Sequence, residues 1–398
     1  MIYSVMQISL KSHKKQTKAP DRIFHHIIGE KPGSTIVFFG GIHGNEYAGV
    51  NALNNTLKDI RPEDVHGEIY GVYGNIKALE KNKRFLKSDL NRMWTLRQIK
   101  ELQYSKNLTD EELEQEDLFR FLNQLLSTND SPLYFIDLHT TSSKSLPFIT
   151  INDALINRKF SSQFPVPVVL GIEEYLDGPL LSYLNTLGYV SLGFESGQHT
   201  DPEAVTNCEA FIYLALKHAG NLKSLHTEKH EQKLIEASKN VSSIYEVIYK
   251  YHIKPKEQFT MVDGFESFQK ISKGTLLAVT DGIKIYSEHN AKLFMPLYQK
   301  SGNDGYFIIR NIPRFFLKLS EILRKIKADS LLTVLPGITW HDRQKGVLKA
   351  NLTVARFMAK SIFHLFGYRN KQIDKTHLLL YNRERVSKNR MYKKEIWY

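Results

Sequence analysis

The sequence predicts an α/β fold in which helices flank a mixed, mainly parallel sheet. Three largely apolar runs, at residues 35–39, 133–138 and 189–194, are typical of strands that are buried on both faces of such a sheet. Each run ends in polar side chains, which predicts a site at one edge of the sheet. Segments with the period of amphipathic helices accompany the runs, at residues 47–57, 108–126, 178–187 and 204–218.

The chain is too long for one hydrophobic core, because cores stop growing at roughly 250–300 residues and this chain has 398. We predict three regions: an α/β domain with the candidate site at residues 1–225, a small β-rich domain at 226–315, and a basic, partly helical C-terminal extension at 316–398. Between residues 259 and 309, short strand-like runs alternate with turns that contain glycine, which is typical of a small β-sandwich or barrel.

The C-terminal extension is expected to contain one basic helix, since Leu348, Leu352, Phe357, Ile362 and Phe366 recur at helical spacing. From residue 311 onward there are 19 Lys and Arg against 6 Asp and Glu, a balance of +13, so the rest of the chain sums to −1. Such a balance can attract an anionic partner, but no nucleic-acid-binding motif accompanies it. We predict no specific nucleic-acid partner, and interpret the extension as a structural appendage or as one that forms a homo-oligomer.

The sequence also predicts a cytoplasmic protein. Its one cysteine, Cys208, excludes an intramolecular disulfide and is typical of a reducing compartment. No run of about 18 apolar residues marks a transmembrane helix. The N-terminus lacks the basic stretch before an apolar core that marks a signal peptide.

A candidate metal site begins directly after the first apolar run. Two glycines, Gly40 and Gly41, allow a tight turn there. His43 and Glu46 follow three residues apart, a spacing that puts both side chains on one side of a turn or helix start. An imidazole and a carboxylate suit zinc, which needs a further ligand from elsewhere in the chain.

His139, directly after the second apolar run, is the candidate third ligand. Because sites in open α/β sheets form beyond the carboxyl ends of the strands, we expect His139 to converge with His43. A lone histidine at a strand end is more often structural, but the combination with His43 and Glu46 favours a ligand. Asp137 is a candidate hydrogen-bond partner that would orient His139.

Further polar residues follow the same arrangement. Glu195 ends the third apolar run, so its carboxylate is directed to the same edge of the sheet. Arg84, Asn91 and Arg92 lie in a polar loop, and arginine can bind an anion through two parallel hydrogen bonds. The alternative for this loop is a solvated basic surface.

Together these motifs resemble the succinylglutamate desuccinylase/aspartoacylase family, a branch of the zinc carboxypeptidase fold. The resemblance rests on the order, types and approximate spacing of the residues and extends over residues 35–306. It implies a zinc carboxypeptidase-like α/β fold, and it implies that His43, Glu46 and His139 bind one Zn²⁺ per chain.

The resemblance also implies roles for the remaining residues. Glu195 corresponds to the catalytic carboxylate, which moves a proton from water to the leaving amine. Arg84 corresponds to the group that polarises the scissile carbonyl. Asn91 and Arg92 correspond to the pair that holds the carboxylate of the substrate. Tyr306 is loosely similar to a substrate-binding tyrosine of the family, and packing in the core of the β-rich domain is its alternative.

We therefore predict a zinc-dependent hydrolase that cleaves the amide bond of an N-acyl amino acid by metal-activated water. A zinc carboxypeptidase that acts on a short peptide is the alternative enzyme. A binding protein on an inactive scaffold is a further alternative, which a missing ligand or a missing Glu195 would favour; none is missing. Aspartoacylases carry a further arginine shortly before the catalytic glutamate, whereas residues 183–189 contain none, so the resemblance does not extend to a dicarboxylic substrate.

Overall fold

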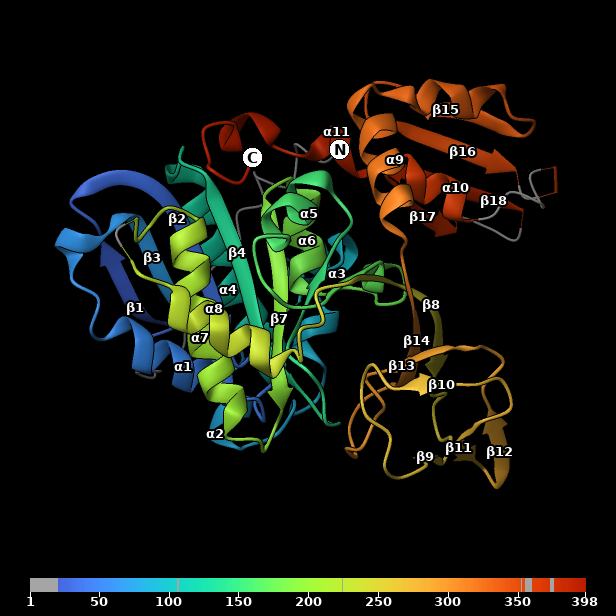
Figure 1. The fold of residues 1–398 in the computed structure, drawn as a ribbon, viewed down its shortest axis with the longest axis horizontal. Helices are drawn as coiled ribbons and strands as arrows, with labels where there is room; N and C mark the ends of the chain where they lie inside the picture. The colour runs from blue at the N-terminus through green and yellow to red at the C-terminus, as the bar shows by residue number, and fades with distance from the viewer. Residues whose placement is uncertain (1–20, 106, 224, 352, 355–359, 373–375) are drawn as a thin grey trace.

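The central feature of the fold is one large mixed sheet, which confirms the predicted α/β class (Figure 1). The computed structural model describes residues 21–398 apart from 106, 224, 352, 355–359 and 373–375. The strands from β3 to β8 pair in parallel, except that β5 is antiparallel to β7. In spatial order the eleven strands are β1 (Ile23–Ile28), β3 (His66–Tyr73), β2 (Lys31–Gly40), β4 (Leu133–Thr141), β7 (Val190–Gln198), β5 (Phe148–Ile151), β6 (Val168–Leu170), β8 (Ile244–His252), β14 (Asp304–Asn311), β13 (Ala291–Phe294) and β10 (Lys270–Ile271).

Helices cover both faces of the central sheet, as the alternation of side chains along a strand requires. Phe38 of β2 joins a core cluster with residues of α1 and α7, whereas Phe39 joins a second cluster with residues of α3, α4 and α6. The sheet is therefore buried on both faces in its centre. The bounds of the helices are α1 (Ala48–Leu57), α3 (Leu96–Leu102), α4 (Asp110–Thr128), α5 (Leu155–Ser161), α6 (Leu180–Thr186), α7 (Glu203–His218) and α8 (Glu228–Ala237).

The strands within residues 226–315, the region predicted as a small β-rich domain, lie in two sheets, and residues of both sheets share one core cluster. β8 pairs with β6, so that β8, β14, β13 and β10 continue the central sheet. β12 (Ile283–Tyr286), β11 (Leu276–Thr280) and β9 (Phe259–Met261) form a separate three-stranded sheet. Local patterns indicated short strands with turns, but the partner of each strand depends on residues far apart in the chain.

The C-terminal extension contains a four-stranded antiparallel sheet where one basic helix was expected. Leu348 lies in a strand and Ile362 in a short helix, while Leu352 and Phe357 lie outside the described residues. Leu348 belongs to a strand because β16 pairs with a neighbour on each side, which local spacing cannot reveal. The elements are α9 (Arg314–Lys325), β15 (Ile338–Asp342), β16 (Val347–Asn351), α10 (Lys360–Leu365), β17 (Tyr368–Gln372) and β18 (His377–Asn382), with the sheet order β15, β16, β18, β17.

The end of the extension packs back onto the α/β region. After α11 (Arg383–Val386), Tyr392 and Trp397 enter the core cluster that contains residues of α1 and α7. The Tyr392 hydroxyl donates to the carbonyl oxygen of Leu133 at 2.5 Å and accepts from the backbone N–H of Val190 at 3.0 Å. Among the helices of the described residues, none has the length and apolar character needed to cross a membrane.

Candidate functional site

The turn after β2 carries the first two residues of the site, His43 and Glu46. Gly44 is required in this turn, because a Cβ atom there would lie 2.1 Å from the carbonyl carbon of Ala78. The turn therefore packs directly against α2 (Ile76–Glu80). This contact fixes where the two side chains begin.

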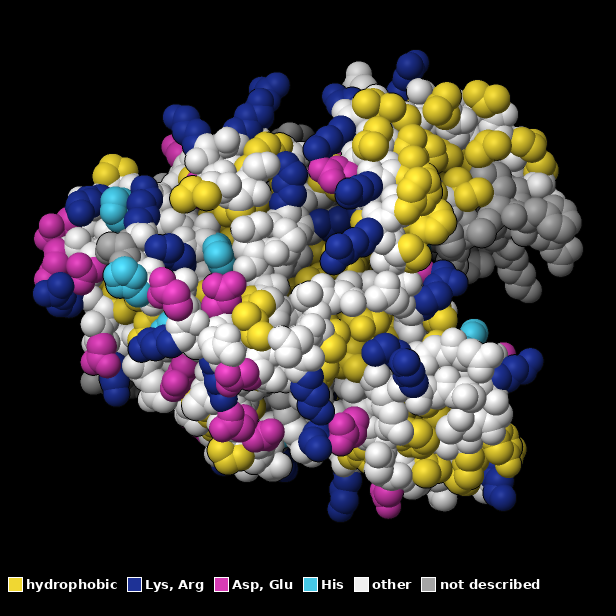
Figure 2. All heavy atoms as spheres, viewed as in Figure 1, with side chains coloured by type: hydrophobic (Ala, Val, Ile, Leu, Met, Phe, Trp, Pro, Cys, Tyr) yellow, Lys and Arg dark blue, Asp and Glu magenta, His cyan; other side chains and the backbone are white. Residues whose placement is uncertain are grey.

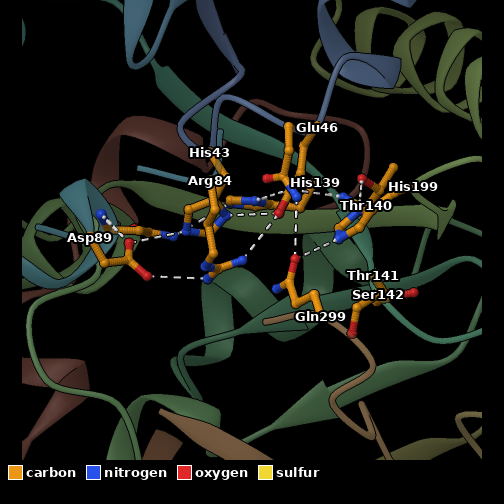
Figure 3. Close-up of polar contacts among 12 residues, drawn as sticks. His43, Glu46, Arg84, Asp89, His139, Thr140, Thr141, Ser142, His199 and Gln299 are labelled. Atoms are coloured by element: carbon orange, nitrogen blue, oxygen red, sulfur yellow. Dashed lines mark hydrogen bonds and ion pairs between the residues drawn. The ribbon is translucent and has the colours of Figure 1, made fainter. Parts of the chain in front are cut away.

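His43, Glu46 and His139 meet in one buried group (Figure 3). The Glu46 carboxylate lies between the two imidazoles: Oε1 is 2.9 Å from Nδ1 of His43, and Oε2 is 2.9 Å from Nδ1 of His139. The backbone N–H of Thr140 also donates to Oε2, at 3.0 Å. One potential ligand atom of each residue lies within 4.8 Å of the other two. The predicted convergence of His43 with His139 is present.

The outer nitrogen of each imidazole faces a carboxylate. Nε2 of His43 is 3.1 Å from Oδ1 of Asp89, and Nε2 of His139 is 2.7 Å from Oδ2 of Asp137. The expected contact between Asp137 and His139 is therefore confirmed. A carboxylate in this position favours the proton on Nε2, so that the lone pair of Nδ1 is free for a metal ion.

The charges of the group shift the pKa values of its members. Burial by itself raises the pKa of Glu46, but the charges and hydrogen bonds of His43 and His139 hold that pKa well below its usual range. Burial lowers the pKa of His139, yet Asp137 and Glu46 outweigh burial and hold that pKa well above its usual range. Glu46 is therefore an anion, the form in which a carboxylate binds a cation.

Glu195 lies beside this group on β7, where it is paired in register with His139 of β4. Burial raises the pKa of Glu195 to about 8, and the charges of Glu46 and Asp137 add to this effect. His139 and Arg84 act in the opposite direction. Oε2 of Glu195 is buried and has no hydrogen-bond partner among the described residues, so it is available to a ligand.

The polar loop brings Arg84 to the same group. Nη1 of Arg84 is 3.4 Å from Oε1 of Glu46, and Nη2 is 3.1 Å from Oδ2 of Asp89. Nε of Arg84 is buried without a hydrogen-bond partner in the part of the chain that the structure describes. The N–H of Nε is therefore left for a ligand, and the loop is not simply a solvated basic surface.

Asn91 and Arg92 line the same cavity and are held by other elements. Oδ1 of Asn91 accepts from the backbone N–H of Leu180 at 2.9 Å, and Nδ2 is 3.5 Å from Nε2 of His139. Nη2 of Arg92 donates to Oδ2 of Asp304 at 2.9 Å. Because Asp304 begins β14, the β-rich region contributes directly to the site.

Several residues of the site were not predicted from the sequence, among them Asp89, His199 and Gln299. Nδ1 of His199 is 2.7 Å from Oγ1 of Thr140, and Nε2 is 3.3 Å from Oε1 of Gln299 (Figure 3). Asp89 had a signal in the sequence, a carboxylate beside the cations of the loop and two residues before Asn91. Gln299 had none, because it reaches the site from a distant strand connection.

The structure does not bring Tyr306 to the cavity. Its ring is buried in a cluster of the β-rich region and stacks on Tyr251 with 5.4 Å between ring centroids. Asp304 lines the cavity instead. The register of β14 against β8 shifts between Asp304 and Tyr306, and such an irregularity changes where the next side chain points. Tyr306 is thus a residue of the core of the β-rich region, which was the alternative to substrate binding.

A cavity of about 140 Å³ is lined by His43, Glu46, Arg84, Asn91, Arg92, His139 and Glu195. Its wall also contains apolar side chains of the β-rich region, Met295, Leu297 and Phe307. Further lining residues come from β5, β7, α6 and the connections after β5 and β6. Five of them are polar (Thr150, Asn152, Glu173, Ser182 and Ser191) and five are apolar (Ile151, Ile172, Leu176, Pro179 and Leu181).

The donor set could hold a zinc ion. Two imidazoles and a carboxylate form the protein ligands of many catalytic zinc sites, which keep a further position open. In this chain the potential ligand atoms are buried close together, and the cavity opens on them. The contacts of Asp89 and Asp137 behind the imidazoles are those expected of metal-binding histidines.

Comparison with known proteins finds similarity to one family over the part of the chain that carries this site. The family model described as "Succinylglutamate desuccinylase/Aspartoacylase catalytic domain" matches residues 32–209. A succinylglutamate desuccinylase of Pseudomonas fluorescens (strain Pf0-1) is 31% identical over 110 residues, which are 27% of this chain and 31% of that protein. The aspartoacylase of Rattus norvegicus is 31% identical over 206 residues, 48% of this chain and 63% of that protein. The matches thus span less than two thirds of the length of these relatives.

A solved structure of similar fold extends this likeness beyond the matched segment. The crystal structure of a succinylglutamate desuccinylase/aspartoacylase from Rhodobacter sphaeroides superimposes with a TM-score of 0.55 at 18% sequence identity. The superposition covers 71% of this chain and 87% of that chain. At this identity the likeness concerns the fold, and it confirms the fold that the resemblance implied.

Proposed function

We propose that the protein is a zinc-dependent deacylase. The proposal is supported by the match of residues 32–209 to the model of the succinylglutamate desuccinylase/aspartoacylase catalytic domain and by the similarity to an aspartoacylase. The protein would hydrolyse the amide bond of an N-acyl amino acid. His43, Glu46 and His139 would hold one Zn²⁺ per chain. The predicted cytoplasmic location belongs to the same proposal.

One observation carries this proposal: a buried carboxylate lies between two imidazole Nδ1 atoms, and a further carboxylate stands behind each imidazole. Burial of several ionisable groups costs free energy unless they are paired or coordinate a metal. Packing alone does not account for two features beside His43, Glu46 and His139: the cavity and the oxygen of Glu195 that has no partner among the described residues. The arrangement is therefore best accounted for as a reaction site.

When bound, the zinc ion would act as a Lewis acid that makes water reactive at neutral pH. The raised pKa of the neighbouring Glu195 would fall beside the charge of a bound zinc ion. The ionised carboxylate would then take a proton from the attacking water through Oε2, which has no other partner among the described residues. The same carboxyl group then gives the proton to the nitrogen of the leaving amine. No covalent bond between the protein and the substrate is needed for this sequence.

The polar loop would bind and orient the substrate. Nε of Arg84 is the donor left free for the oxygen of the scissile carbonyl, a contribution of the type that is worth about 2.7–4 kcal/mol per donor in other enzymes. Asn91 and Arg92 would hold the carboxylate of the amino acid. Asp304 holds Arg92 in place and is itself held by Nζ of Lys250 at 3.0 Å.

The test is metal analysis followed by amine release from a panel of N-acyl amino acids and short peptides. One zinc per chain, with release from the acyl compounds that Glu195→Gln abolishes, is the expected result. Glu203→Gln, on the surface of α7, is the matched control and should leave release unchanged. Undiminished amine release by Glu195→Gln would show that Glu195 does not transfer the proton. Release of amino acids from peptides alone would favour the carboxypeptidase. A protein that binds no zinc would contradict the proposal as a whole.

A further inference from the structure

A second set of unpaired polar atoms lines the cavity. Glu173 and Ser191 are buried, with 1% and 2% of their surfaces exposed, and both belong to the cavity wall. Oε2 of Glu173 and Oγ of Ser191 have no hydrogen-bond partner in the described part of the chain. A buried polar atom without a partner costs free energy, so these two atoms are candidates for contact with a ligand.

The strand β7 sets the distance between Ser191 and Glu195, which lies beside the candidate metal centre. Ser191 and Glu195 are four residues apart on β7, so they point to the same face at roughly 13 Å from each other. Thr150 and Leu181 pack over Gly193 between them, so closely that a Cβ atom at Gly193 would lie 2.7 Å from Oγ1 of Thr150. Thr150 and Leu181 also line the cavity, which therefore extends along β7 from one group to the other.

Only one of the two carboxylate oxygens of Glu173 has a partner among the described residues, although two guanidinium groups lie near: Nη2 of Arg369 donates to the backbone carbonyl oxygen of Glu173 at 2.7 Å and not to its carboxylate. Glu173 and Glu174 share one guanidinium group, since Nη2 of Arg383 donates to Oε1 of each at 2.8 Å. Glu174 has an additional neighbour in His364, with 3.0 Å between Nε2 of the imidazole and the carboxylate. Glu174 does not line the cavity, whereas Glu173 does. The unpaired oxygen at the cavity therefore belongs to Glu173.

Positive charge is in surplus at Arg92, the residue proposed to bind the carboxylate of the substrate. Arg92 and Lys250 share a single carboxylate, that of Asp304. The cavity thus combines a site with surplus positive charge and a site with a carboxylate oxygen unpaired by any described residue, Oε2 of Glu173. Such a pair is complementary to a ligand that carries a carboxylate at one end and a cationic group at the other.

We propose, on the basis of the proposed deacylase function, that Glu173 and Ser191 form a subsite for a primary ammonium group. The substrate is then an N-acyl derivative of an amino acid with a cationic side chain. Arg92 holds its α-carboxylate, and Oε2 of Glu173 accepts from the side-chain ammonium group. The lack of an arginine in residues 183–189 agrees with a substrate that has no second carboxylate.

The experiment compares Nα-acetyl-lysine with N-acetyl-norleucine, which has the same four side-chain carbons and no ammonium group. We expect the zinc-loaded protein to prefer the lysine derivative by about tenfold or more in kcat/KM, since one charged hydrogen bond is at stake. Glu173→Gln should remove this preference by raising KM for the lysine derivative with little change in kcat. Glu174 also binds Arg383 but does not line the cavity, so the variant Glu174→Gln should keep the preference for the lysine derivative.

Calorimetric binding of free lysine and free norleucine separates the subsite from the reaction. If neither acetyl derivative is hydrolysed, the proposed function fails, and the binding data still judge the subsite. Tighter binding of lysine that depends on Glu173 supports the subsite. Equal affinities for both amino acids, or a lysine preference that survives in Glu173→Gln, overturn it.

An independent feature lies on the C-terminal extension, where the inner face of α9 makes polar contacts beside Leu317, which packs against the core cluster that contains residues of α1 and α7. Oγ of Ser320 donates to the carbonyl oxygen of Leu365 at 2.9 Å. Nη2 of the buried Arg324 donates to Oδ2 of Asp153 at 2.6 Å and to the carbonyl oxygen of His364 at 2.5 Å. Hydrogen bonds, an ion pair and the packing of Leu317 thus hold the inner face of the helix to the rest of the molecule.

The outer face of α9 is apolar and exposed. Phe315, Ile322 and Ile326 lie on one stripe, because spacings of seven and eleven residues return to the same side of a helix. Figure 2 shows hydrophobic side chains gathered over α9 and the segment next to it, with Lys and Arg side chains beside them. This outer apolar face consists of side chains that are 46% to 82% exposed: Phe315, Phe316, Ile322, Ile326, Leu331 and Val334.

The charge of the extension indicates what covers this face. Arg314, Lys318 and Lys327 are exposed at or next to α9, and the sequence from residue 311 onward has a balance of +13. A second copy of the chain would bring like charges together, whereas an anionic lipid surface would satisfy both the apolar and the basic side chains. We propose that the outer apolar face binds in the interface of an anionic membrane.

The experiment is flotation of the full chain with vesicles of phosphatidylcholine, alone or mixed with phosphatidylserine. We expect binding to the anionic vesicles that weakens with salt, and that falls by about tenfold or more in the double variant Lys318→Glu and Lys327→Glu. The pair Phe315→Ser and Ile322→Ser should also lose binding. Ile283→Ser, which removes an exposed apolar side chain from β12, is the matched control and should bind normally.

Either of two results overturns the membrane proposal. One is the absence of binding to the anionic vesicles. The other is a concentration-dependent oligomer, seen by light scattering, that Phe315→Ser with Ile322→Ser dissolves; this result assigns the face to a second copy of the chain. Thermal unfolding of each variant, with an unchanged Tm, shows that a loss of binding is not a loss of folding.

Discussion

Oδ1 of Asp89 lies 3.1 Å from Nε2 of His43, and this contact joins the polar loop to the candidate metal centre. The same carboxylate accepts from Nη2 of Arg84 at 3.1 Å and from the backbone N–H of Asn91 at 2.9 Å. Burial raises the pKa of Asp89, but the charge and hydrogen bond of His43 and the charge of Arg84 hold that pKa well below its usual range. One ionised side chain thus positions an imidazole, an arginine and an asparagine.

Asp89→Asn should weaken zinc binding about tenfold to hundredfold, the usual effect of removing a carboxylate behind a metal-binding histidine. The imidazole of His43 loses an anionic partner, so its Nδ1 becomes a weaker and less well oriented ligand. Competition with a chromophoric chelator measures the change in Kd. Asp64→Asn, whose carboxylate pairs with Arg61 on the surface, is the control and should not alter Kd. Equal affinity in both variants would show that Asp89 does not orient the ligand.

Zinc should stabilise the protein against thermal unfolding. A ligand that binds only the folded state at a free concentration of 100 Kd adds about 2.7 kcal/mol to the free energy of unfolding. The group of His43, Glu46 and His139 exists only in the folded chain, since its members come from distant segments. The Tm should therefore rise with added zinc and fall with a chelator. In His139→Ala the Tm should not respond to zinc; a response of normal size would place the metal elsewhere.

The pH dependence of stability should depend on Asp153. Burial raises the pKa of this carboxyl group, but the charges of Arg158 and Arg324 outweigh burial and hold the pKa below its usual range. A depressed pKa in the folded state means that the stabilisation is complete above the unfolded value of about 3.9 and is lost as pH falls below it.

We expect Asp153→Asn to lower the free energy of unfolding by about 3–5 kcal/mol at neutral pH, because the buried Arg324 would then lose the closer of its two carboxylate partners and keep only Glu384 at 3.2 Å. The difference from the wild type should shrink as the pH falls below about 4. Urea unfolding at a series of pH values measures both quantities. A difference that stays constant to the lowest pH would show that Asp153 is not the titrating group.

Tyr392→Phe should lower the free energy of unfolding by about 1–3 kcal/mol, the cost of leaving buried polar groups unpaired. The Tyr392 hydroxyl accepts from the N–H of Val190 and donates to the carbonyl oxygen of Leu133, and it joins the last turn of the chain to β4 and β7. Chemical denaturation checks the value. Tyr104→Phe, on an exposed side chain, should have no measurable effect; a similar loss there would point to a general effect of the substitution.

The strands that carry the site could be predicted because each is a continuous apolar run. β2, β4 and β7 are buried on both faces, and such strands are recognisable without knowledge of their neighbours. The short strands of the β-rich region were recognised as strands, but their place in the central sheet was not. That place depends on the pairing of β8 with β6, a contact between segments that are far apart in the chain.

By itself the sequence determined the identity of the residues that converge at the carboxyl ends of these strands. His43, Glu46, His139 and Glu195 were predictable because a residue type and a strand end together define both chemistry and position. The tertiary structure alone decided which groups surround them. Asp89 behind His43 and the unpaired oxygen of Glu173 depend on side-chain contacts between distant segments, and Tyr306 turns into the core because of a register shift in β14. Such contacts have no signature in local spacing, since they arise only when the packed elements meet.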